Sequence, residues 1–393
     1  MDSLKQAVVL VIFGIHSLPQ RVGQSAVIVL GVAGVVSVLL AVLGISGSLQ
    51  RVIASSGQPN RALVLRTSSR SESQSSLTRE DIVAIEAAPG ILRSDSGRAR
   101  VSPELLTQYR LVDPAQDLRV EVVIRGVDPD PTLMRSELKL MEGRLARPGL
   151  REIIVGKNAR AQYKELDLSR QIEIAGVPWT VVGIFDSGGD AHSSEIFADS
   201  ETLMSAIHRN AYNSALVVLS DPDEFHRFKD FITANPSIAA DAYAEPKYYQ
   251  EQSDTVLHAW SFVAYVVGGI MALGAMIAAA NTMYSSVAAR HVEIATLRAV
   301  GFRPTSVAVA VLTEALLLAV LGAILGTVVV WLLFAGNPIS TQFGAGRVIT
   351  QLQLGPALLM LGMVWAIAIS TLAGLFPAIR ASRQPIAEAL REE

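Results

Sequence analysis

The chain has 393 residues, of which 50% are hydrophobic and 18% charged, with a formal net charge of −3 and no cysteine. It is more apolar and less charged than an ordinary soluble domain. The charge balance gives no support for nucleic-acid binding, and the lack of cysteine excludes thiolate metal sites and cysteine nucleophiles. The composition therefore favours a membrane protein.

The first segment, residues 1–20, is an apolar run with Lys5 and His16 at its polar edges. No small-residue cleavage site follows it. We therefore expect an amphipathic helix at the cytoplasmic face of the membrane rather than a cleaved signal peptide.

Four later stretches, residues 22–50, 255–289, 304–346 and 348–379, carry almost no charge, and their only acidic, basic or histidine residues are His258 and Glu314. A helix needs about twenty apolar residues to cross a bilayer, and each stretch is long enough for one. The sequence therefore predicts four transmembrane helices, at residues 21–50, 256–287, 304–334 and 352–379.

The first of these helices contains Gly31 and Gly34. Small residues let helices approach closely, so this pair is a candidate for packing against a second copy of the chain. Glycine is also common in transmembrane helices that have no such contact, and the sequence leaves both interpretations open.

Residues 51–255 alternate strand-like and helical segments, which predicts an extracytoplasmic α+β domain of two lobes with a strand-rich insert at about residues 145–200. Thr78 can cap a helix with Asp81 at its third position, ending at Pro89-Gly90. The expected strands are residues 61–67, 119–130, 151–156, 171–176, 179–185 and 214–220, and a further helix is expected at residues 222–234.

Basic residues are unevenly distributed around the spans. Residues 51–255 hold 24 Lys and Arg against 30 Asp and Glu, a net charge of −6, and the loop at residues 335–351 holds one basic residue, Arg347. Short loops rich in Lys and Arg stay in the cytoplasm, so both termini, the segment 288–303 and the tail 380–393 are predicted to be cytoplasmic. The eight basic residues of these parts are Lys5, Arg21, Arg290, Arg298, Arg303, Arg380, Arg383 and Arg391.

Glu314 lies inside the third span, about 16 Å along the helix from Arg303. A charge at that depth is costly, so Glu314 is either a functional group or a protonated residue in a structural hydrogen bond between helices. The sequence shows no basic partner for it inside the membrane, which favours the structural role.

The stretch "DSGGDAHSSE" (186–195) gathers side chains that could ligate a metal ion or activate a nucleophile: Asp186, Asp190, His192, Ser193 and Glu195. Its glycines and serines favour a flexible polar loop instead. The 393 residues contain no phosphate-binding loop, no H-E-x-x-H and no G-x-S-x-G pattern. We expect no catalytic, metal or cofactor site in this chain.

The segment "NTMYSSVAARHVEIATLRAVGF" (281–302) changes abruptly from apolar to charged. As a helix at residues 288–303 it is amphipathic, and it can dock into a groove on a soluble partner or rest on lipid headgroups. Glu293 among the arginines and the stop at Gly301 favour a protein partner. The contact residues expected are Arg290, His291, Glu293, Ile294, Leu297 and Arg298.

This segment resembles the coupling-helix signature of the MacB/FtsX-type ABC transporter permeases, N-T-M…R…E-I-x-x-L-R-A-x-G. The ending "LFPAIRASRQPIAEALRE" (375–392) is similar to that family's ending, and "TEALLLAVLGAILG" (313–326) is similar to its third span, including the acidic residue. The resemblance extends over the full length: interfacial helix, span, large outer domain and three further spans.

The resemblance implies a permease subunit of a bacterial inner membrane that works as a homodimer with a cognate ABC ATPase on a separate chain, where ATP and Mg bind. Movement of the ATPase is expected to pass through the coupling helix to outer lobes like the family's Porter and Sabre lobes. Residues 335–351 are the expected contact with a periplasmic partner.

The task expected from the resemblance is export across the envelope with a membrane-fusion adaptor and an outer-membrane channel. The sequence leaves two alternatives open. One is extraction of a lipoprotein or lipid from the membrane, and the other is signalling control of a cell-wall hydrolase without transport.

Overall fold

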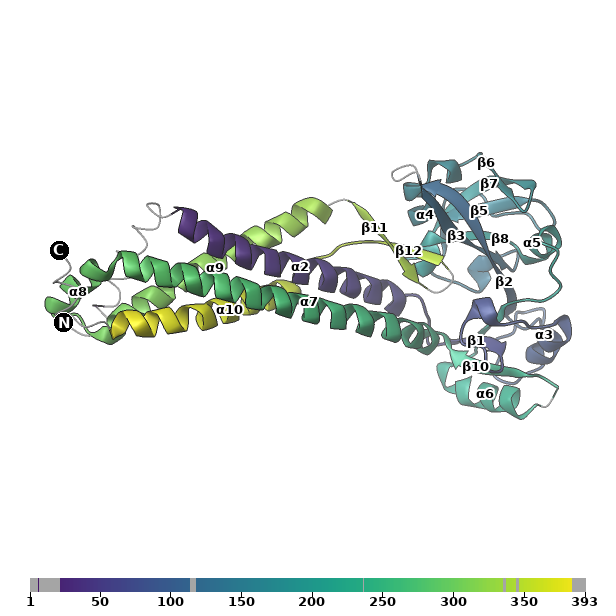
Figure 1. Ribbon diagram of the computed structural model, residues 1–393. Helices are drawn as coiled ribbons and strands as arrows, with labels where there is room; N and C mark the ends of the chain where they lie inside the picture. The colour runs from purple at the N-terminus through teal and green to yellow at the C-terminus, as the bar shows by residue number, and fades with distance from the viewer. Residues whose placement is uncertain are drawn as a thin grey trace. The chain divides into compact units, whose positions relative to one another are not determined.

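A computed structural model describes residues 6, 22–113, 118–235, 237–334, 337–343 and 346–383 of the chain. Except for residue 6, the predicted interfacial helix lies outside these ranges, as does the tail beyond residue 383. The chain divides into two compact units (Figure 1). A helical unit lies within Met1–Ser46, His258–Asn337 and Leu352–Glu393, and a globular domain comprises Gly47–Leu257 and Pro338–Gln351.

Four helices in the described part of the chain are long and apolar enough to cross a membrane, as the sequence predicts. They are α2 (Val22–Ala54), α7 (Glu245–Ala289), α9 (Pro304–Phe334) and α10 (Pro356–Ser382), and the short α8 (His291–Ala299) lies between α7 and α9 in the chain.

Helix α7 begins well before the predicted start of the second span at residue 256. Its 45 residues correspond to a length of about 68 Å, more than twice the hydrocarbon thickness of a bilayer. Pro246 occupies the first turn, where proline is compatible with a helix, and no glycine or proline interrupts the polar residues that follow. The division between the two units falls within α7, and also within α2.

The globular domain contains one ten-stranded sheet in the order β10-β1-β9-β2-β3-β8-β5-β7-β4, with β6 paired to β7. The long β2 joins its two lobes, because residues 101–104 pair with β9 and residues 105–113 pair with β3. The strands are β1 (Arg61–Arg66), β2 (Val101–Asp113), β3 (Leu118–Val127), β4 (Lys139–Gly143), β5 (Glu152–Gly156), β6 (Gln171–Ile174), β7 (Val177–Asp186), β8 (Ile196–Asp199), β9 (Ser214–Val218) and β10 (Ala240–Ala244).

Two helices accompany each lobe. The lobe of β1, β9 and β10 carries α3 (Arg79–Glu86) and α6 (Phe225–Ala234), and the strand-rich lobe carries α4 (Lys157–Gln162) and α5 (Ser200–Ala206) (Figure 1). The predicted cap of α3 is confirmed: Thr78 and Asp81 form a capping box in which each side chain accepts from the other's backbone N–H. A mixed α and β domain of two lobes, with four long apolar helices, is the predicted fold class.

Residues 338–351, predicted as part of a short loop, instead form an antiparallel hairpin of β11 (Pro338–Phe343) and β12 (Gly346–Gln351). Val348 and Ile349 of β12 are buried in the core of the globular domain. The β-branched residues in "PISTQF" and "GRVITQ" are a strand signal that the sequence analysis missed.

Candidate coupling site

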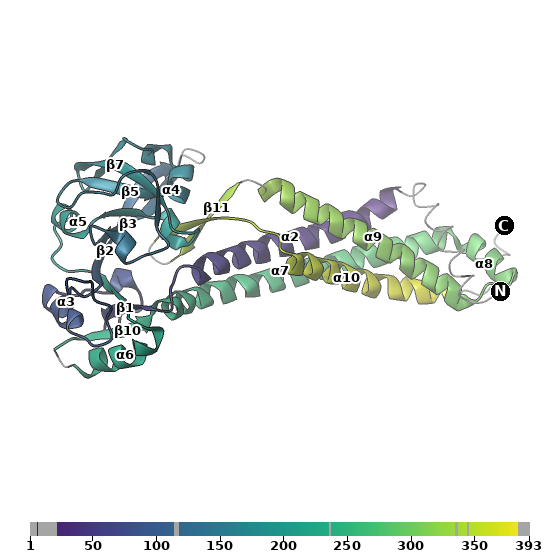
Figure 2. The same ribbon diagram turned by 180° about the vertical axis from the view of Figure 1, so that it is seen from behind.

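Helix α8 lies at the end of the helical unit where α7 stops and α9 starts (Figure 2). Arg290 is its N-cap residue. At its other end the amides of Gly301 and Phe302 donate to the carbonyls of Arg298 and Leu297, both at 3.1 Å, which is the Schellman arrangement. Gly301 has φ +105°, a conformation that side chains disfavour, so the predicted stop is confirmed and its cause is local.

The two faces of α8 have different roles. Ile294 and Ala295 are buried at 7% and 3% exposure, and Leu297 packs against the same apolar cluster of the helical unit. Val292, Glu293 and Thr296 are exposed. The apolar face therefore holds α8 against the chain's own helices, and the exposed face is the one that a soluble partner can reach. The sequence analysis placed Ile294 and Leu297 at the partner contact, because a helical pattern does not tell which apolar face is already covered.

Arg290 joins α8 to the third span. Its Nε lies 3.1 Å from Glu293 Oε2, and its Nη1 lies 3.5 Å from Glu314 Oε2 on α9. The side chains of Arg290 and Glu314 are only 13% and 11% exposed, whereas Glu293 is 55% exposed. The sequence shows no basic partner for Glu314 inside the membrane, and the structure pairs Glu314 with Arg290 at the start of α8. The partner is 24 positions earlier in the sequence, and only the reversal of the chain between α7 and α9 brings the two together.

A cavity of about 40 Å³ adjoins this ion pair, bounded by α7, α8 and α9. Its polar lining comes from Ser286, Arg290 and Glu314, and the remaining walls are apolar. The volume is enough for a water molecule or two, which need polar partners of this kind. A change in the position of α8 would therefore alter the surroundings of a buried acid inside the helical unit.

The other predicted contact residues lie nearby. The Nδ1 atom of His291 is 2.9 Å from the carbonyl oxygen of Ala288. Arg298 is in the last turn of α8, where a cation complements the helix dipole. The guanidinium of Arg380, near the end of α10, lies over the ring of Tyr284 at 5.7 Å from its centroid. Basic residues thus gather at this end of the helical unit.

Gly31 and Gly34 face α7 of the same chain. A Cβ added at Gly31 would lie 3.6 Å from the Cβ of Ala275, and one at Gly34 would lie 3.8 Å from the Cε of Met271. Both are ordinary contacts, so these glycines have neighbours within the chain, and their role in a dimer stays a prediction.

A tighter glycine contact was missed by the sequence analysis. Gly322 and Gly326 of α9 have the true GxxxG spacing and lie against α2. A Cβ on Gly322 would be 2.8 Å from the Val29 carbonyl oxygen, and one on Gly326 would be 2.7 Å from that of Ala33.

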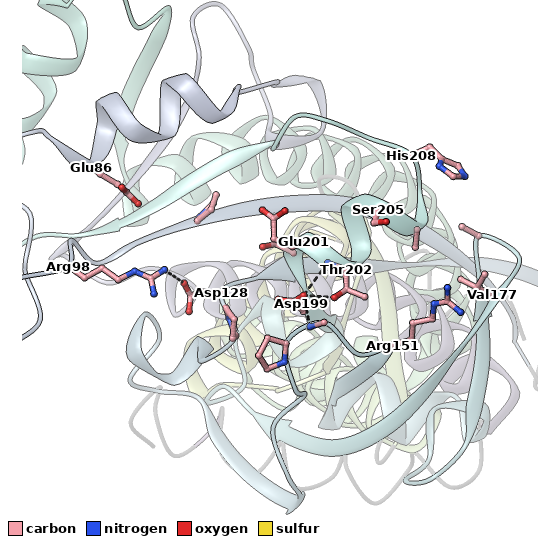
Figure 3. A pocket seen from close by; sticks show the side chains of 17 residues that line it. Glu86, Arg98, Asp128, Arg151, Val177, Asp199, Glu201, Thr202, Ser205 and His208 are labelled. Carbon is pink, nitrogen blue, oxygen red and sulfur yellow. Dashed lines mark hydrogen bonds and ion pairs between the residues drawn. The ribbon is translucent and has the colours of Figure 1, made fainter. Parts of the chain in front are cut away.

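The globular domain also has an open cleft of about 910 Å³ (Figure 3). Its charged groups include Arg98 and Asp128, which form an ion pair at 3.2 Å. Asp199 accepts hydrogen bonds from the amides of Thr202 and Gly149 at the edge of the cleft. These side chains bond one another, and the cleft gives no indication of a particular ligand.

Among the described residues, no group of three or more His, Cys, Asp or Glu side chains is placed to hold a metal ion, and this includes the acidic and histidine residues of 186–195. The sequence analysis expected the segment to be a flexible polar loop, and the structure differs. Its residues 190–194 are buried and include a 3-10 helix, Ala191–Ser194.

Two family models match the chain. A MacB-like periplasmic core domain matches residues 25–234, and an FtsX-like permease C-terminal model matches residues 265–386. With the four long apolar helices, these matches define a multi-pass membrane protein with a periplasmic domain. The first model covers more than half of the chain, and the chain belongs to the family of MacB/FtsX-type ABC transporter permeases.

The curated relatives include the macrolide export ATP-binding/permease protein MacB from two strains of Campylobacter jejuni. Each is 31% identical over 167 residues, which are 42% of this chain and 23% of the relative. The match therefore spans about a quarter of the length of these relatives.

Two solved structures are also similar. One is the extracellular domain of the ABC-type transporter YknZ from Gram-positive bacteria, with 16% identity, 47% of this chain and 100% of that chain covered, and a TM-score of 0.36. The other is the periplasmic region of MacB from Actinobacillus actinomycetemcomitans, with 15% identity, 51% and 96% covered, and a TM-score of 0.38.

Proposed function

We propose that the chain is the permease subunit of an ABC transporter and that it transmits movement of a separate ATPase subunit, through α8, to its periplasmic domain. In this proposal the chain works as a homodimer, and ATP and Mg bind to the partner ATPase. The termini and α8 lie in the cytoplasm of a bacterial cell, with the helical unit in the inner membrane.

The observation that carries the proposal is the chain of charges Glu293–Arg290–Glu314. Glu293 is exposed on the face of α8 that a partner can reach, and Glu314 is buried on a membrane helix. A partner that pulls or pushes α8 therefore acts on α9 through Arg290 as well as through the packing of Ile294. Buried ion pairs resist separation, because an unpaired buried charge is costly.

Binding of the ATPase tests the first half of the proposal. Glu293→Ala combined with Val300→Ser removes one exposed carboxylate and one exposed apolar side chain, which is 76% exposed, without touching the buried face. Docked helices concentrate affinity in a few residues, so we expect about thirtyfold weaker binding to the cognate ATPase, or about 2 kcal/mol. Co-purification and binding titrations in nanodiscs measure this.

The matched control is Thr305→Ala, an exposed side chain at the start of α9. It should leave the affinity unchanged. If the double variant binds the ATPase as tightly as the control does, α8 rests on lipid headgroups and the coupling proposal fails.

We propose further that the transporter exports a substrate across the envelope together with a membrane-fusion adaptor and an outer-membrane channel. The match to a MacB-like periplasmic core supports this, as does the export named for the Campylobacter relatives. The proposed adaptor contact is the part of the β11–β12 hairpin that is not buried in the core of the globular domain.

Photo-crosslinking from Gln351, an exposed residue of β12, tests the export assignment in cells. Export predicts an adduct with a membrane-fusion adaptor, identified by mass spectrometry. An adduct with a lipoprotein chaperone or with a cell-wall hydrolase regulator, and none with an adaptor, would replace export by one of those functions.

A further inference from the structure

The residues Asp190–Glu195, called the junction turn below, are almost completely buried. They follow β7 and precede β8 in the strand-rich lobe. Asp190 caps the 3-10 helix by accepting from the amide of Ser193, and His192 and Ser193 have no exposed surface. A buried turn made of polar residues needs partners for its backbone and side chains, and those partners identify what it does.

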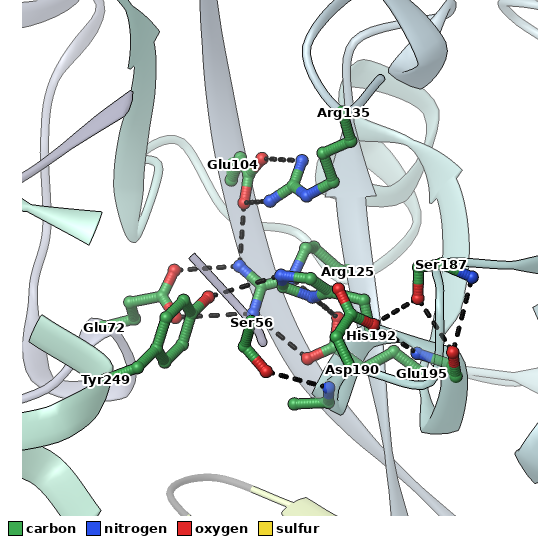
Figure 4. A network of polar contacts seen from close by, with 12 residues as sticks. Ser56, Glu72, Glu104, Arg125, Arg135, Ser187, Asp190, His192, Glu195 and Tyr249 are labelled. Atoms are coloured by element: carbon green, nitrogen blue, oxygen red, sulfur yellow. Dashed lines mark hydrogen bonds and ion pairs between the residues drawn. The ribbon is translucent and has the colours of Figure 1, made fainter. Parts of the chain in front are cut away.

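Three partners come from three different segments that lead along the chain into the helical unit. The amide of Ala191 donates to Ser56 Oγ at 2.9 Å, two residues beyond the end of α2. The hydroxyl of Tyr249, on the first turns of α7, lies 3.4 Å from Nε2 of His192 (Figure 4).

The third partner is the hairpin. The amide of Ile349 on β12 donates to Ser194 Oγ at 3.1 Å. The carbonyl of Ile349 accepts from Nδ2 of Asn158 on α4 at 3.2 Å, so both backbone polar groups of Ile349 are bonded to the strand-rich lobe. Ser56, Tyr249, Ser194 and Ile349 are all at most 6% exposed. These are specific bonds inside a packed core rather than surface contacts.

The junction turn is bonded to both lobes through a buried set of charges (Figure 4). His192 Nδ1 is 2.9 Å from Glu195 Oε2, and Glu195 accepts from Arg125 of β3 at 2.8 and 3.1 Å. Arg125 also donates to Glu104 of β2 at 2.7 Å, and to Glu72 in the first lobe at 2.8 Å.

The opposite charges in this set stabilise one another. Burial opposes ionisation of Glu195, but Arg125 and His192 outweigh it and hold the pKa of that carboxyl well below its usual range. An arginine with three buried carboxylate partners cannot lose one of them without leaving an unpaired charge in the core. Separating the turn from β2 or β3 would therefore leave a buried charge without its partner.

We propose that the junction turn is the point at which movements of α2, α7 and the β11–β12 hairpin are combined and passed to the strand-rich lobe. This inference rests on the proposed function, in which the ATPase subunit is the source of the movement. Ser56, Tyr249 and Ser194 are positioning residues, each of which fixes one incoming segment to the turn, and the Arg125 cluster passes the displacement into the sheet.

Hydrogen exchange on the full-length chain in nanodiscs tests the linkage without the ATPase. Ser56→Ala removes the acceptor of the Ala191 amide. If the turn links α2 to β12, exchange should become at least about fivefold faster in the peptide that contains Ile349, although Ser56 does not bond to β12. Linkage is reciprocal, so Ser194→Ala should speed exchange around Ser56.

Ser55→Ala is the matched control, since Ser55 is exposed and its hydroxyl donates back to the carbonyl oxygen of Val52 in the last turn of α2. It should leave the Ile349 peptide unchanged. An increase confined to the peptide that carries each substitution would overturn the inference. Ser56→Ala and Ser194→Ala each remove one hydroxyl and no carbon atom from the core, so both variants should remain folded.

A second measurement separates this inference from the proposed function. The chain has no natural cysteine, so labels at Glu173→Cys and Asp230→Cys report only on the two lobes. With the ATPase bound, ATP should change the distance between the labels, and Ser56→Ala with Ser194→Ala should at least halve that change while hydrolysis continues. No ATP-dependent change in the parent protein would refute the proposed function. A full change in the double variant would refute the junction turn.

Discussion

Arg290 is the basic partner of Glu314 in the structure. A carboxylate inside a membrane helix is costly without a partner, and Nη1 of Arg290 lies 3.5 Å from Oε2 of Glu314, whose side chain is 11% exposed. Arg290 also bonds the exposed Glu293, so one side chain connects α8 with α9.

We predict that Glu314→Gln leaves the chain folded but lowers stimulation of the bound ATPase several-fold. The amide keeps the shape of the side chain and can still accept a hydrogen bond from Arg290, but the attraction between charges is lost. The free energy of unfolding should fall by about 2 kcal/mol, a usual value for a hydrogen bond to a charged group. Reconstituted ATPase assays and unfolding in detergent measure the two effects.

The same substitution at the exposed Glu293 is the control, and its stability should change by less than about 0.5 kcal/mol. Reduced stability of Glu314→Gln with full stimulation would assign Glu314 a purely structural role.

His192 gives the periplasmic domain a defined pH dependence. Burial by itself lowers the pKa of His192, but the Glu195 carboxylate at 2.9 Å outweighs burial and raises the pKa above its ordinary value near 6.5. Asp190 also favours the charged form, whereas Arg135 opposes it. The proton is thus bound more tightly in the folded than in the unfolded chain.

The stabilisation by protonated His192 should be fully present below about pH 6.5 and should be lost as the pH rises through the higher folded-state pKa. We therefore expect the difference in melting temperature between the parent protein and His192→Gln to be largest in acid and to shrink at alkaline pH. Thermal unfolding of the full-length chain in detergent from pH 5 to pH 9 measures it. A difference that grows with pH would contradict the assignment of charge to His192.

At the scale of elements, close packing of backbones organises the helical unit. Gly322 and Gly326 let α9 approach the carbonyls of α2, and Ser37 Oγ donates to the Gly326 carbonyl at 3.1 Å. In a bilayer, helices gain little from burying apolar surface, so such contacts decide which faces meet.

Gly326→Ala should separate α9 from α2, because the new Cβ would lie 2.7 Å from the Ala33 carbonyl oxygen, a backbone atom that cannot swing aside. We expect a loss of about 1–3 kcal/mol in unfolding free energy, the usual cost of overpacking. Gly274→Ala on α7 is the matched control, with nothing within 4 Å of the new Cβ. It should be neutral or stabilising by up to about 1 kcal/mol, because alanine favours a helix. Equal stability of the two variants in detergent would show that the α2–α9 contact is not close.

At the scale of the whole molecule, the arrangement of basic residues predicts the topology. The absence of natural cysteine makes single-cysteine labelling unambiguous. Ser73→Cys, exposed in the serine-rich segment after β1, should react with a membrane-impermeant maleimide in intact spheroplasts. Thr296→Cys, exposed on α8, should react only after the membrane is permeabilised, and a reporter fused after Glu393 should be active in the cytoplasm. Labelling with the opposite preference would reverse the orientation and remove the basis for ATPase docking at α8.

The sequence by itself determined the features that depend only on residues close together in the chain. Length and apolarity fix the four long helices, the pair Thr78 and Asp81 caps α3, and Gly301 stops α8, because each signal acts within one or two turns of chain. The strands β1, β6 and β7 were predicted close to their observed bounds, whereas β2, β4, β8 and β10 were missed.

Tertiary structure alone decided which distant groups meet. Arg290 meets Glu314 because the chain reverses direction between α7 and α9, with α8 at the reversal. The face of α8 that carries Ile294 is buried at the same place. The segment 186–195 looked like a mobile loop, since its glycines and serines are typical of one. Its residues 190–194 are buried, and Ser56, Tyr249 and Ile349, from three remote parts of the chain, supply hydrogen bonds that a buried polar turn needs. No periodicity within ten residues carries that information, because the partners lie 57 to 155 positions away.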